Sequence, residues 1–121
     1  MFRSVSLLVS AAALCCSCAH AHQEARSPDG RYLARVGTVD GGAMSSGATS
    51  VSLSAAGASL PLLRHDVFFT SGIYDVEVRW NHNVLEVVCE YCPLDRVEVK
   101  QGVWNEVHIV YPRFGARAVS R

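Results

Sequence analysis

Residues 74–91, YDVEVRWNHNVLEVVCEY, indicate the fold class more clearly than any other stretch of the chain. Across 74–80, aromatic and valine side chains alternate with charged ones, so an extended strand presents one apolar face and one wet face. Residues 81–83, Asn-His-Asn, are typical of a tight turn. Residues 84–91 then continue as a second strand, with a leucine, a valine and a cysteine on one side. The stretch therefore predicts two neighbouring strands that are buried on one face.

Similar short strands are expected along the rest of the chain. They fall at 31–39, 49–53, 67–69, 97–100 and 106–111, where 107, 109 and 111 share one face and 106, 108 and 110 the other. Turn signals such as Ser27-Pro28-Asp29-Gly30 separate them, and no amphipathic helix of three turns is evident. We predict an all-β fold, a small single-domain antiparallel sandwich or barrel of about seven strands. Its expected core, besides the valines, comprises Trp80, Trp104, Tyr74, Phe68 and Phe69.

The N-terminal 21 residues have the layout of a secretory signal peptide. Arg3 supplies a positive charge, residues 5–14 are apolar apart from serines, and Ala19-His20-Ala21 is a small-x-small cleavage site. The apolar run is too short to span a membrane. We therefore expect a signal peptide at 1–21, a polar leader at 22–27, a β domain at 28–112 and a C-terminal tail at 113–121.

Cys18 offers a second interpretation of the same segment, as the lipid-carrying cysteine of a bacterial lipoprotein. Ser17 before it fits such a site, whereas Cys15 stands where leucine is usual. Two localisations remain open. The protein is exported either as a free periplasmic or secreted protein or as a membrane-anchored lipoprotein.

The overall composition excludes two classes of partner. The chain of 121 residues carries 11 basic and 11 acidic residues, with no basic stripe and no run of like charge. Neither nucleic-acid binding nor electrostatic membrane binding has a basis in such a sequence. Contact with a membrane is expected only through a lipid at Cys18.

Cys89 and Cys92 are the two cysteines of the expected mature domain, and an even pair in an exported protein predicts a disulfide. Residues three apart on an extended strand point to opposite faces, so the bridge requires a bend at Tyr91–Cys92. The C-x-x-C spacing also allows a small thiol-redox protein. However, Pro93 follows directly and no helical pattern comes after it, so the helix N-terminus of a thioredoxin-type site is missing.

Several histidines are weak metal-ligand candidates. Cleavage after Ala21 would make His22 the N-terminus, where amine and imidazole can chelate Cu(II) together with His65, His82 or His108. A zinc site could combine His82 and His108 with the pair Cys89 and Cys92, although a single C-x-x-C is weak support for zinc. In the alternative view, His82 is a turn residue and His108 lies on a solvent-facing strand side. No G-x-S-x-G elbow is present, and we expect neither a catalytic residue nor a cofactor.

The order of short motifs resembles that of one known family. These motifs are SPDGRY (27–32), SVSL (50–53), DVFF (66–69), DVEVRW (75–80), NVLEVVCEYCP (83–93) and WNEVHIVY (104–111). Over residues 27–111 the chain is similar to a family of uncharacterised small bacterial exported proteins and lipoproteins that share a domain of unknown function. The resemblance implies export and a compact β-rich domain. It implies no activity, so no functional residue is carried over.

Together these observations predict an exported, non-enzymatic envelope or secreted protein that acts as a binding or interaction module for an unknown partner. The alternatives are a periplasmic copper-binding protein that uses His22 and a thiol-redox protein that uses Cys89 and Cys92. A binding module requires an exposed apolar or aromatic patch. A redox protein requires an accessible Cys89 with a lowered pKa.

Overall fold

The computed structural model describes residues 19–39, 47–57 and 65–119 of the chain, with side chains from Gln23 onward. Residues 1–18 of the expected signal peptide, including the lipidation candidate Cys18, lie outside the described residues. Within the described part, no helix is long and apolar enough to cross a membrane.

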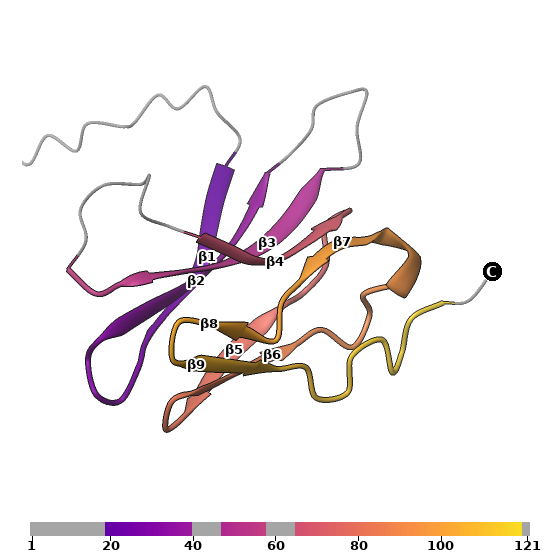
Figure 1. Ribbon diagram of the computed structural model, residues 1–121. Helices are drawn as coiled ribbons and strands as arrows, with labels where there is room; N and C mark the ends of the chain where they lie inside the picture. The colour runs from indigo at the N-terminus through magenta and orange to yellow at the C-terminus, as the bar shows by residue number, and fades with distance from the viewer. Residues whose placement is uncertain (1–18, 40–46, 58–64, 120–121) are drawn as a thin grey trace, which may run out of the picture.

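Nine strands form two sheets, which lie as separate layers in Figure 1. The five-stranded sheet is antiparallel throughout and contains, in spatial order, β1 (Ala19–Arg26), β2 (Tyr32–Val39), β3 (Ala48–Ala55), β4 (His65–Ser71) and β7 (Val97–Lys100). The four-stranded sheet contains, in spatial order, β5 (Glu77–Asn81), β6 (Val84–Val88), β9 (Val107–Val110) and β8 (Val103–Trp104). The prediction of an all-β sandwich is confirmed.

The core lies between the two sheets and follows the alternation of the sequence. Val107 and Ile109 of β9 are buried, whereas His108 and Val110, which alternate with them, are exposed. Both sheets contribute to the fully buried side chains, the largest of which are Phe68, Leu53 and Leu85. Of the five aromatic residues expected in the core, only Phe68 is fully buried. The other four are partly buried, namely Phe69, Tyr74, Trp80 and Trp104.

One pairing departs from a purely antiparallel sandwich. Strands β6 and β9 run parallel, with Leu85 opposite Ile109. The chain between them passes through β7 of the other sheet and through β8, so a long crossover joins the parallel pair. This order is set by contacts between distant segments, which strand periodicity does not report.

The expected leader at 22–27 is wrong, because residues 19–26 form strand β1 and pair with β2 along its length. The side chain of Gln23 also fastens this strand to the second sheet. Its Nε2 donates to the carbonyl oxygen of Val78 at 2.9 Å, and its Oε1 accepts from the Val78 amide at 3.0 Å. The indole of Trp80 donates to the carbonyl oxygen of Ala25 at 2.9 Å. The segment carries few apolar side chains. It joins the fold mainly through hydrogen bonds at the edge of the sheet, and this explains why it looks like a polar leader in the sequence.

Two other boundaries differ from the prediction. The strand expected from Tyr74 begins only at Glu77, since residues 72–76 form the link between the two sheets. The expected tail is also wrong in its first part, because residues 113–117 lie in turns and Phe114 packs against the core. Both segments contribute to the site described next.

Candidate binding site

The disulfide between Cys89 and Cys92 shapes one end of the sandwich. Both cysteines are fully buried, and the chain turns at Glu90 and Tyr91 between them, close to the predicted bend. A buried disulfide of this kind is inert and structural, which argues against the thiol-redox alternative. The tight turn also directs Tyr91 outward, where 50% of the residue is exposed.

A short 3-10 helix, Leu94–Arg96, follows the disulfide and contains no buried residue. It is held to the sheet by the hydroxyl of Thr70, which donates to the carbonyl oxygen of Arg96 at 3.0 Å. Thr70 itself is fully buried in β4. This anchor leaves Leu94 on the surface with 69% of the residue exposed.

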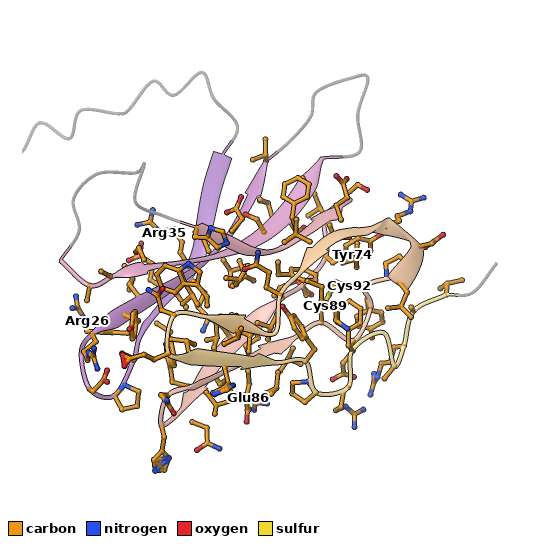
Figure 2. The ribbon with its side chains drawn as sticks, in the orientation of Figure 1. Arg26, Arg35, Tyr74, Glu86, Cys89 and Cys92 are labelled. Carbon is orange, nitrogen blue, oxygen red and sulfur yellow. A yellow bond between two sulfur atoms is a disulfide. The ribbon has the colours of Figure 1, made fainter. Side chains whose placement is uncertain are left out.

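A second buried threonine positions the link between the sheets. The hydroxyl of Thr49 donates to the carbonyl oxygen of Gly72 at 2.8 Å and accepts from the amide of Tyr74 at 3.1 Å. Gly72 has φ of +95°, and a Cβ at this position would lie 2.7 Å from the Tyr74 ring. The backbone at Gly72 therefore requires glycine, and Tyr74 is held beside the disulfide. Tyr74, labelled near the two cysteines in Figure 2, lines the same hollow as Cys92.

The C-terminal segment forms the opposite wall. Its backbone pairs with the disulfide turn, because the amide of Gly115 donates to Cys89 at 3.0 Å and that of Arg117 to Glu90 at 2.7 Å. The ring of Phe114 packs edge-on to that of Phe68 with centroids 5.9 Å apart. The segment is thus fixed by both hydrogen bonds and aromatic packing.

These walls enclose a groove of about 820 Å³, which we call the disulfide groove. Its aromatic and apolar lining comprises Tyr74, Tyr91, Pro93, Leu94, Phe114 and Val119. Two charged residues, Asp95 and Arg96, also line it and balance each other in formal charge. Val119 is 78% exposed. The groove therefore brings together Tyr91, Leu94 and Val119, three of the exposed large apolar residues in the described part of the chain.

A smaller hollow of about 460 Å³, which we call the acidic pocket, shares Tyr91 with the groove. Its charged lining residues are Asp75, Glu77, Glu90 and Arg117. Glu90 forms ion pairs with Arg117 at 3.0 Å and with Arg113 at 3.3 Å. Hydrogen bonding to Tyr91 and the charge of Glu90 raise the pKa of the Arg117 guanidinium above its ordinary value.

Asp75 and Glu77 differ from Glu90 in having no cationic partner. Neither carboxylate makes an ion pair with any residue in the described ranges. The acidic pocket therefore carries two uncompensated negative charges beside an apolar groove.

The structure places the side chains of His65, His82 and His108 on separate elements. His65 in β4 stacks on Trp104 and bonds to the side chain of Gln101, while His82 lies in the turn after β5 and His108 faces outward from β9. His22 lies in β1 at an irregularity of the pairing with β2. Among the described residues, no group of three histidine, cysteine or acidic side chains could hold a metal ion. The zinc hypothesis also fails chemically, since Cys89 and Cys92 are consumed by their disulfide.

Sequence reasoning identified the disulfide but missed the groove around it. Leu94 and Val119 lie in segments interpreted as a strand break and a tail, where isolated apolar residues carry little meaning. Four apolar residues in the expected tail, including Phe114, were the available signal that this segment packs on the domain. No protein-family model, curated protein sequence or solved structure matches this chain.

Proposed function

We propose that this protein is an exported, non-enzymatic binding module and that the disulfide groove is its binding site. The observation that carries the proposal is the gathering of Tyr91, Leu94 and Val119 around one concave surface. Single exposed apolar residues are normal on a protein, whereas a contiguous apolar patch with a polar rim is typical of an interaction site. The groove is also concave and combines exposed apolar side chains with charged ones, and ligand sites likewise combine apolar surface with polar groups that orient the ligand.

The way the walls are held supports the same function. A disulfide, two buried threonine hydroxyls and two backbone hydrogen bonds fix the segments that line the groove. A preformed site loses less conformational entropy when it binds than a flexible one does. The exposed apolar side chains are therefore presented in one defined arrangement.

The proposal of export rests on the signal-peptide layout of residues 1–21 and on the disulfide, since such bridges persist in oxidising compartments. Intact-mass measurement of the protein from its native source tests it. A mass beginning at His22 identifies a free exported protein, and a mass beginning at Cys18 with added acyl chains identifies a lipoprotein. A mass that includes all of residues 1–121 contradicts export through this segment.

Binding by the groove is tested by selecting displayed random nonapeptides on the purified protein. The Leu94→Asp variant adds a charge in the groove, and Val103→Asp is the matched control, because Val103 is 54% exposed on β8 and does not line the groove. We expect the selected peptides to bind the wild type and the Val103 variant equally and to bind the Leu94 variant at least about tenfold more weakly. Peptides that bind both variants equally, or no selected peptides at all, would contradict the proposal.

A further inference from the structure

We infer that the ligand of the groove is an extended peptide segment in which a large apolar side chain is followed by a lysine or arginine. The apolar side chain occupies the disulfide groove, and the cation lies in the acidic pocket. This inference rests on the proposed function of the groove and adds the chemistry of its partner.

The two hollows are close enough for a single short segment to reach both. Tyr91 lines both of them. On the facing wall, the consecutive residues Tyr74 and Asp75 line the groove and the acidic pocket respectively. An extended peptide advances about 3.3 Å per residue, so adjacent or next-but-one side chains span such a junction.

The distribution of charge selects the sign of the second side chain. The lining of the acidic pocket carries three carboxylates and one guanidinium, a formal charge of −2. The lining of the groove carries one acidic and one basic side chain, which cancel. Glu90 is paired with two guanidiniums, those of Arg113 and Arg117, and this trio carries a formal charge of +1. Together with the trio, Asp75 and Glu77 leave a formal charge of −1, so the attraction for a cation comes from these two carboxylates.

An anionic ligand fits this arrangement less well. The guanidinium of Arg117, the cation that lines the acidic pocket, is engaged by Glu90 at 3.0 Å and by the hydroxyl of Tyr91 at 3.5 Å. An incoming carboxylate would have to compete with Glu90 and would face two unpaired carboxylates. A neutral ligand would gain only from the apolar groove.

The experiment compares three synthetic hexapeptides, Ser-Leu-Phe-Lys-Ser-Ser and its versions with glutamine or glutamate in place of lysine. Binding to the full mature protein is followed by amide chemical shifts of Tyr91 and Leu94 in NMR titrations at low and high salt. At low salt we expect the lysine peptide to bind about fivefold more tightly than the glutamine peptide, with the glutamate peptide weakest. This difference should shrink at high salt, where exposed charges are screened.

Protein variants then locate the charge effect. The double variant Asp75→Asn/Glu77→Gln should remove the preference for lysine, so that the lysine and glutamine peptides bind it with equal affinity. The matched control is Glu24→Gln/Asp66→Asn, which removes the same charge from exposed positions that line neither hollow. This control should retain the lysine preference.

The outcomes separate this inference from the proposed function. Equal binding of all three peptides, lost in Leu94→Asp, would leave the groove as a binding site and overturn the cation inference. Preference for the glutamate peptide, or a lysine preference that survives the Asp75/Glu77 variant, would also overturn it. Failure of all three peptides to shift Tyr91 and Leu94 up to millimolar concentration would count against both.

Discussion

Replacement of Gln23 by methionine tests the finding that β1 is fastened to the second sheet. Methionine keeps the approximate length and volume of glutamine but forms neither of its hydrogen bonds to Val78. Val78 is only 1% exposed, so its amide and carbonyl are poorly placed to bond with water instead. Each buried polar group left without a partner costs about 1–3 kcal/mol, and the two together predict a loss of about 2–6 kcal/mol. That is a large share of the roughly 5–15 kcal/mol that stabilises a typical domain.

Urea denaturation followed by tryptophan fluorescence measures this loss, because the indole of Trp80 bonds to Ala25 in the same strand. In thermal denaturation the same change corresponds to a fall in Tm of roughly 10–25 °C. The control is Glu24→Met at the neighbouring position, which removes only a surface ion pair with Arg35 and should cost no more than about 1 kcal/mol. A loss for the Gln23 variant no greater than that of the control would refute the reasoning.

Gln23→Glu adds a dependence on pH with a defined sign. A protonated carboxyl can donate to the Val78 carbonyl and accept from its amide, whereas an ionised one can only accept. Folding should therefore raise the pKa of the new carboxyl, so its stabilisation is present below the unfolded pKa and is lost as pH rises through the folded pKa. The deficit relative to the wild type should be larger at pH 7 than at pH 4, and equal deficits would contradict the proposed bonding.

Three further predictions concern other parts of the fold. The double variant Cys89→Ala/Cys92→Ala opens a loop with a sequence separation of 3, and its free energy of unfolding in urea denaturation should be about 2 kcal/mol lower than that of the wild type. The same variant should no longer bind peptides in the groove. Burial raises the pKa of Tyr111, so the stability that this neutral hydroxyl provides should be lost as pH rises above the unfolded value of about 10. The variant Tyr111→Phe should lack the alkaline step that ionisation of Tyr111 produces in the absorbance at 295 nm. It should also lower the free energy of unfolding by about 1 kcal/mol, because the hydrogen bond from the Tyr111 hydroxyl to the carbonyl oxygen of Gln101 at 2.7 Å is lost. The hydroxyl of Ser27 donates to Asp29 and lowers the pKa of its carboxyl. The stability that the ionised carboxylate contributes should therefore be lost as the pH falls below the pKa of the unfolded state and through that of the folded state. Asp29→Asn should abolish this part of the dependence of Tm on acid pH.

The sequence alone was sufficient for the fold class and for most strand faces. Alternation along a strand is a local property, since successive side chains point to opposite sides whatever the strand pairs with. Val107 and Ile109 were therefore placed on one face of their strand and His108 and Val110 on the other, as the structure has them. The disulfide was predictable for a similar reason, because two cysteines three residues apart can meet wherever the chain bends between them.

The sequence did not reveal the segments whose role depends on distant partners. Strand β1 carries little apolar signal, and its attachment through Gln23 spans 55 residues to Val78. Residues 113–119 likewise became part of the domain through backbone bonds to Cys89 and Glu90. Each of these hydrogen bonds has a backbone group on at least one side, and nearly every residue offers such groups, so the side-chain pattern does not reveal which distant residue is the partner.

The binding groove belongs to this second class. The local sequence indicated that the C-terminal residues are exposed and that the chain bends between the two cysteines. Only the tertiary structure brought the link at Tyr74, the turn at Tyr91 and the C-terminal residue Val119 around one hollow. The physical reason is that a concave surface is made by segments from different parts of the chain, whose positions are set by the packing and hydrogen bonds of the whole sandwich.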